Sequence, residues 1–177
     1  MDECEKKVKG RPLIGYFKYV KKKWGADGLM VCEKAVGFKY SDIRDEVWYP
    51  RAYSDDIIVW IASTHGRDAV TSAARSMVSE VGVISFAARV AGMDRVLDRA
   101  VDEVRASLNF GKVSVKKESG GALVTLRDYC SSEDVCAAWQ GILEGVMELT
   151  KTRGVVEEVK CQNKGAEACV YRMTWGR

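Results

Sequence analysis

Residues 112–129, KVSVKKESGGALVTLRDY, decide the fold class of this chain. Apolar and polar side chains alternate over residues 112–117, and they alternate again over residues 122–129. A period of two is typical of strands that bury one face. Gly120 and Gly121 lie between the two runs and favour a tight turn, because glycine accepts the positive φ values that such turns require. We therefore predict a β-hairpin over this stretch.

The sequence after this hairpin predicts a helix and then a second hairpin. Ser131 or Ser132 is expected to cap a helix that runs to about Thr152. Gly141 and Gly145 lie four residues apart on this helix, which indicates close packing against another element. Two strands are predicted after it, at residues 155–161 and 169–175, and the Asn-Lys-Gly sequence between them is typical of a turn.

The sequence before residue 112 predicts helices. Leu13, Phe17, Val20 and Trp24 have helical spacing and indicate an amphipathic helix, and residues 25–52 are predicted to be irregular. Further helices are predicted at residues 53–65, 68–80, 81–92 and 95–110. This order predicts an α+β fold, in which N-terminal helices pack on an antiparallel sheet made of two hairpins with a helix between them. At 177 residues, we expect a single domain over residues 1–177.

Composition and charge exclude several classes of protein. With 47% hydrophobic residues the chain can form a core, and no apolar run reaches the roughly 18–20 residues that span a bilayer. The start of the chain is acidic and then basic, unlike a secretory signal, so we expect a cytoplasmic location. Residues 1–24 carry eight basic and three acidic side chains, a charge of +5, and the rest of the chain carries −2, which gives the net charge of +3. We interpret these cations as one solvated helix face, and we expect no direct binding to nucleic acid.

The sequence contains no complete catalytic constellation. The only histidine, His65, cannot form a Ser-His-Asp triad or a multi-histidine metal site by itself. It could bind a haem, but a surface position at a helix end is the favoured interpretation. No glycine-rich nucleotide loop follows a strand, and nothing supplies a hydride or electron carrier site, so catalysis is not supported.

The cysteines near the C-terminus suggest a metal site. Cys161 and Cys169 flank the second predicted turn, so antiparallel pairing would bring their sulfurs together. Glu158 lies three residues before Cys161, and the two can face one ion only if the strand ends or bulges between them. Cys136, in the first turn of the preceding helix, could supply a fourth ligand, and Cys130 is the alternative to it. Three thiolates and one carboxylate suit a structural Zn²⁺ site, whereas the competing interpretation is that these cysteines are small buried apolar residues.

A family resemblance rests on the cysteines, glycines and glutamate of the last third of the chain. These residues are Cys136-Ala-Ala-Trp139, Gly141, Gly145, Val156-Glu157-Glu158-Val-Lys-Cys161, Gly165 and Cys169-Val-Tyr171. The pattern resembles the vinyl-4-reductase domain family over residues 111–175. Similar domains occur as stand-alone hydrocarbon-binding proteins and as sensor domains of aromatic-responsive transcription activators. The resemblance implies a fold shared with haem nitric-oxide-binding-like domains and with Golgi transport-particle subunits.

The resemblance also implies a ligand set and a pocket. In sensor members three cysteines and a glutamate hold zinc, and the matching positions here are Cys136, Glu158, Cys161 and Cys169. A buried pocket for a small hydrophobic molecule is implied beside them. The candidate wall residues are chosen by periodicity, and for each of them ordinary core is the favoured interpretation. They are Trp60, Phe86, Val90, Phe110, Val113, Val115, Trp139, Val156, Tyr171 and Met173. Phenol-type sensors hold the ligand hydroxyl with a histidine and a tryptophan, and residues 111–117 contain neither.

We therefore predict a cytoplasmic homodimer that binds a small aromatic or hydrocarbon ligand and is stabilised by zinc in its C-terminal portion. The Cys4 and Cys32 side chains are expected to be free thiols. Two alternatives stay open: a scaffold domain without ligand, and an accessory factor in tetrapyrrole or aromatic metabolism. An apolar cavity above about 300 Å³ would favour the ligand-binding domain. A filled core with an exposed apolar patch would favour the scaffold.

Overall fold

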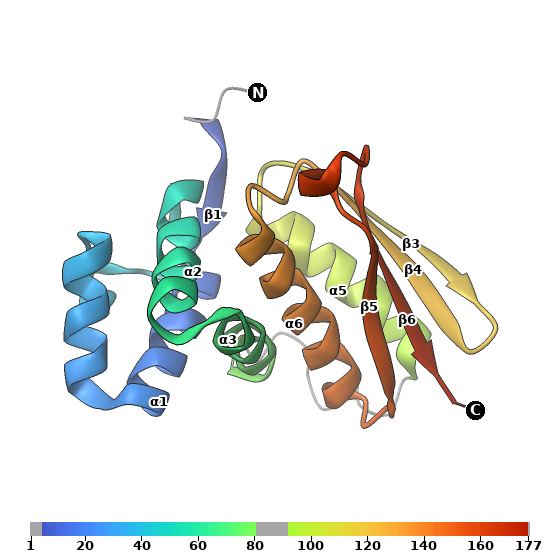
Figure 1. Cartoon of the computed structure of the whole chain (residues 1–177), viewed down its shortest axis with the longest axis horizontal. Coiled ribbons are helices and arrows are strands. Elements are labelled where there is room, and N and C mark those ends of the chain that lie inside the picture. The colour runs from blue at the N-terminus through green and yellow to red at the C-terminus, as the bar shows by residue number, and fades with distance from the viewer. Residues whose placement is uncertain (1–4, 81–91, 177) are drawn as a thin grey trace.

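The structure is a computed structural model that describes residues 5–80 and 92–176. In the described part of the chain, helices and a small two-stranded sheet form the N-terminal half, and the C-terminal half is a four-stranded sheet with helices packed against it (Figure 1). Three predictions concern residues outside these ranges. They are the helix at residues 81–92, of which only residue 92 is described, the pocket candidates Phe86 and Val90, and the free thiol of Cys4. The predicted α+β fold class is confirmed.

The C-terminal sheet is antiparallel throughout. Its strands are β3 (Lys112–Glu118), β4 (Gly121–Arg127), β5 (Gly154–Lys160) and β6 (Cys169–Trp175), in the order β3-β4-β6-β5. Both predicted hairpins are therefore present, and β6 joins them by pairing with β4 on one side and β5 on the other. Residues whose side chains point to the helix-covered face, such as Val156 and Met173, are buried.

Helix α6 (Glu133–Leu149) lies between the sheet and helix α3 (Arg67–Glu80) (Figure 1). The Ser132 hydroxyl caps it by accepting a hydrogen bond from the Val135 amide at 3.3 Å, as the sequence predicts. The two predicted close-packing glycines face α3. A Cβ atom on Gly141 would lie 2.2 Å from the carbonyl oxygen of Thr71, so only glycine allows this approach.

The remaining described helices are α1 (Gly10–Val36), α2 (Arg51–His65) and α5 (Met93–Ser107). The prediction of an irregular segment from residue 25 is wrong for the second half of α1. Gly25 interrupts the helix with φ 73° and ψ −170°, and the helix then resumes to Val36. The reason is that Leu29, Cys32 and Val36 recur at helical spacing and pack against the core.

Two short strands, β1 (Lys7–Lys9) and β2 (Trp48–Pro50), pair antiparallel as a small second sheet, which the sequence pattern does not predict. Short 3-10 helices lie at Tyr40–Asp42 and Gln162–Lys164. Among the described residues, no helix combines the length and apolar character needed to cross a membrane.

Candidate metal centre and apolar cavity

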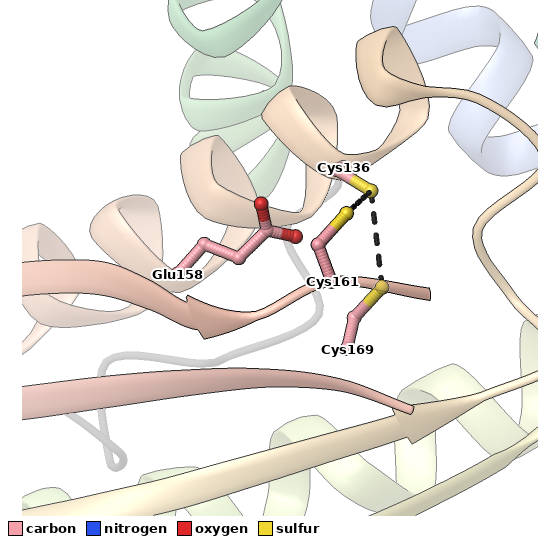
Figure 2. Close-up of side chains that lie close together, drawn as sticks. All are labelled: Cys136, Glu158, Cys161 and Cys169. Atoms are coloured by element: carbon pink, nitrogen blue, oxygen red, sulfur yellow. Dashed lines mark hydrogen bonds between the residues drawn. The ribbon is translucent and has the colours of Figure 1, made fainter. Parts of the chain in front are cut away.

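Three buried thiols and one carboxylate converge where the start of α6 meets the second hairpin (Figure 2). Cys136 lies in the first turn of α6, Cys161 follows β5, and Cys169 begins β6. The sulfur of Cys136 lies 3.6 Å from that of Cys161 and 3.8 Å from that of Cys169. Together with an oxygen of Glu158, all four potential ligand atoms lie within 4.8 Å of one another.

A β-bulge turns Glu158 toward this cluster. In β5, Glu158 pairs with Tyr171, whereas Lys160 already pairs with Val170, so the register shifts between Glu158 and Lys160. The extra residue puts Glu158 and Cys161 on the same side of the hairpin, although three residues separate them. This is the irregularity that the sequence spacing requires for the two side chains to face one ion.

The turn after β5 presents hydrogen-bond donors to the sulfurs. The carbonyl oxygen of Cys161 accepts hydrogen bonds from the amides of Lys164 and Ala166, both at 3.1 Å. In the tight turn that results, the Gln162 amide donates to the sulfur of Cys169 at 3.2 Å, and the Asn163 side chain donates to that of Cys136 at 3.3 Å. Such donors stabilise negative charge on thiolate ligands, and nothing in the sequence pattern marks them in advance.

Tyr171 supports the cluster from the sheet. Its side chain is fully buried, and its hydroxyl lies 2.9 Å from the carbonyl oxygen of Cys136 and 3.2 Å from a carboxylate oxygen of Glu158. The hydroxyl can donate to either acceptor, so it orients the carboxylate toward the sulfurs. The residue predicted as a pocket wall therefore contacts the candidate ligands instead.

The three thiols of the cluster differ in acidity. Burial raises the pKa of the Cys161 thiol to about 12 and also raises that of Cys169. The pKa of Cys136 is lowered to about 6, chiefly because the Cys130 thiol hydrogen-bonds to it. Cys136 is thus the thiol that ionises first, and a bound dication would favour the thiolate form of the other two.

The sulfur spacing suits a tetrahedral zinc ion. Four ligands around Zn²⁺ with Zn–S bonds of about 2.3 Å place their sulfurs about 3.8 Å apart. The two sulfur–sulfur distances of 3.6 and 3.8 Å lie close to this value. Cys130 neighbours Cys136 but does not belong to the four-residue group, so the geometry favours Cys136 over Cys130 as the ligand from this part of the chain.

An apolar cavity of about 170 Å³ also lies against α6. Its described wall comes mainly from α1, α2, α3, α5 and α6, with further residues from β1 and from the segments after α5 and β4. It includes Tyr16, Arg51, Ile58, Met77, Phe110 and Trp139. Phe110 and Trp139 were predicted from the sequence. Tyr16 and Arg51 were not, because nothing in the sequence shows that α1 and α2 meet α6 around a void.

The other described pocket candidates lie elsewhere. Trp60 packs edge-on against Trp24 and His65. Val113 and Val115 belong to β3, and Val156 and Met173 lie in the core on β5 and β6. Neither these residues nor Tyr171 are part of the described cavity wall.

The cavity and the thiol cluster share the start of α6. Val135 and Tyr129 line the cavity, and the next residue after each, Cys136 and Cys130, belongs to or neighbours the cluster. The backbone that would hold a metal therefore also positions the cavity wall.

Comparison with known proteins places this fold with H-NOX domains. An H-NOX protein from S. oneidensis in the Fe(II)NO ligation state superimposes with a TM-score of 0.72 at 14% identity, over 96% of this chain and 100% of that chain. An oxygen-binding H-NOX domain related to soluble guanylate cyclases gives a TM-score of 0.70 at 14% identity, over 96% of both chains. At this identity the similarity establishes the fold alone.

A family model matches the C-terminal part of the chain. Residues 124–174 match the family model of the vinyl-4-reductase domain, which confirms the resemblance for that segment. The match includes all four residues of the thiol and carboxylate cluster. A search of the curated proteins finds no match.

The described residues do not fit a haem, the group that some of these fold neighbours carry. His65 stacks on Trp24 with ring centroids 3.7 Å apart and is not part of the described cavity wall. A cavity of about 170 Å³ is also close to the roughly 150 Å³ that encloses a single benzene ring, far smaller than a porphyrin. The surface position expected for His65 is confirmed by its exposure.

Proposed function

We propose that this protein binds one small hydrophobic molecule in the α6 cavity and holds a structural zinc ion at Cys136, Glu158, Cys161 and Cys169. The observation that carries the ligand-binding proposal is the cavity itself, an apolar space of about 170 Å³ walled by helices from both halves of the chain. The space is partly open, and its lining is predominantly apolar, so it is suited to a hydrophobic occupant.

The cavity volume limits the size of the ligand. At about 170 Å³ it does not meet the criterion of roughly 300 Å³ that we set from the sequence for a drug-sized ligand, but it lies slightly above the roughly 150 Å³ that accepts benzene. The ligand is therefore a molecule of about one ring. Fold neighbours described with nitric oxide or oxygen also hold small ligands, which supports a similar use of the fold here.

The proposed zinc ion has a structural role. Four protein ligands would complete a tetrahedral shell and leave no open position for a substrate. The ion would fasten the second hairpin to the start of α6, in the portion at residues 111–175, and we propose that the whole chain folds around it as one domain. Zinc would thereby hold in place the helix that carries Val135, Ala138 and Trp139 into the cavity wall.

Binding of toluene tests the ligand proposal directly. We expect saturable binding to the wild-type protein in isothermal titration calorimetry. Ala100→Leu enlarges a side chain on the cavity wall and should weaken binding at least tenfold. Ala106→Leu makes the same change at an exposed position of the same helix and should leave binding unchanged. Absence of toluene binding to the folded wild-type protein would overturn the proposal.

A further inference from the structure

Two polar groups on the cavity wall have no hydrogen-bond partner in the described part of the chain. Tyr16, on α1, is only 3% exposed, and Trp139, on α6, is 6% exposed, and both line the cavity. Neither the Tyr16 hydroxyl nor the Trp139 indole N–H makes a hydrogen bond to any described residue. Buried polar groups are almost always paired, so two unpaired ones around a single cavity require an explanation.

Both unpaired groups keep some accessible surface. Among the described residues, every side-chain nitrogen or oxygen that is fully enclosed by protein has a hydrogen-bond partner. The Tyr16 hydroxyl and the Trp139 N–H lack one, so each keeps some free surface. Because both side chains are buried and line the cavity, we take this free surface to be cavity surface.

Both groups are suited to donate a hydrogen bond. An indole N–H can only donate. Burial raises the pKa of Tyr16, so its hydroxyl stays protonated at neutral pH and can also donate. An occupant that satisfies both groups must therefore carry a hydrogen-bond acceptor.

The charged residues on the wall favour a neutral occupant. The Arg51 guanidinium donates to Asp55 at 3.1 Å and to the carbonyl oxygen of Tyr129 at 2.9 Å. Glu103, the other carboxylate on the wall, pairs with Arg99 at 3.1 Å. Each of these charges already has a partner on the protein, so none is set aside for a charged ligand.

We propose that Tyr16 and Trp139 are the ligand-anchoring donors of the cavity, and that the ligand is a neutral molecule of about one ring bearing an acceptor oxygen, such as a ketone carbonyl. This inference rests on the ligand binding proposed above. It adds the chemical class of the ligand, and it assigns specificity to a residue of α1, outside the segment that matches the vinyl-4-reductase domain.

Acetophenone and α-methylstyrene test this assignment, because they have the same shape and differ in a C=O for a C=CH₂ group. We expect Tyr16→Phe, which removes one oxygen atom, to weaken acetophenone binding about threefold to tenfold and to leave α-methylstyrene binding within about twofold of wild type. Tyr19→Phe is the matched control, since Tyr19 lies on the same helix, packs against Trp24 and is not part of the described cavity wall. It should change neither affinity.

An infrared measurement gives a second readout on the folded proteins. The carbonyl stretch of bound acetophenone should lie at lower frequency in wild type than in Tyr16→Phe, because a hydrogen bond donated by the Tyr16 hydroxyl weakens the C=O bond. If neither compound binds wild type, the proposed function itself is overturned. If both bind and Tyr16→Phe alters neither their ratio nor the carbonyl frequency, the role of Tyr16 is overturned while the binding cavity stands.

Discussion

Cys130 and Cys136 lie close together, but only Cys136 belongs to the candidate metal site. Cys136 faces the sulfurs of Cys161 and Cys169 from the first turn of α6, whereas Cys130 lies before that helix and is only partly buried. A tetrahedral site has room for three thiolates and Glu158, so the fourth cysteine of this region is left outside it.

Replacement of Cys161 by serine should therefore release the metal and destabilise the protein. A lost cross-link between the hairpin and α6 is comparable to a lost disulfide, about 2–4 kcal/mol. The melting temperature should fall by roughly 5–15 °C for a chain of this size. Metal analysis and a thermal melt measure both effects. Cys130→Ser is the control and should keep the zinc, and an unchanged melt for Cys161→Ser would show that the hairpin does not depend on the ion.

Helix α6 has three functions on three faces. Its first turn carries Cys136, one side carries Trp139 into the cavity wall, and Gly141 and Gly145 press against α3. The position of this one element therefore determines both the candidate metal site and the cavity, so its contact with α3 bears on both.

Substitution of Gly141 by alanine tests this contact. The new Cβ would meet the backbone oxygen of Thr71, so α3 and α6 must separate, at a cost of about 1–3 kcal/mol. Chemical denaturation should register this loss, and toluene affinity should also fall because both helices line the cavity. Gln140→Ala, at the preceding position of the helix, should have a small effect. Wild-type stability in Gly141→Ala would mean that the helices can part without strain.

At the scale of the whole molecule, the metal site and the ligand site should be coupled. Removal of zinc by a chelator should loosen the start of α6, which carries Val135 and Ala138 on the cavity wall, and should weaken toluene binding at least about threefold. Native mass spectrometry should report one zinc per chain in the loaded protein, and titration calorimetry should measure the affinity before chelation, after it and after zinc is restored. Equal toluene affinity in all three states would show that the zinc site and the ligand site are independent. The same spectra test the homodimer, which, like the cytoplasmic location, stays a prediction.

The sequence by itself determined the hairpin, helix and hairpin order, because strand and helix periods differ and the turns carry glycine. It also indicated that Cys161 and Cys169 come together, since the flanks of a hairpin turn must meet. The places of Cys136 and Glu158 beside them were implied by the family resemblance. The β-bulge that turns Glu158 inward could not be located, because one extra residue leaves no mark in the alternation. The cavity and its unpaired Tyr16 and Trp139 groups were decided only by tertiary structure. Periodicity tells which side chains are buried, but only the packing of α1, α2, α3, α5 and α6 determines whether those side chains meet one another or enclose a space.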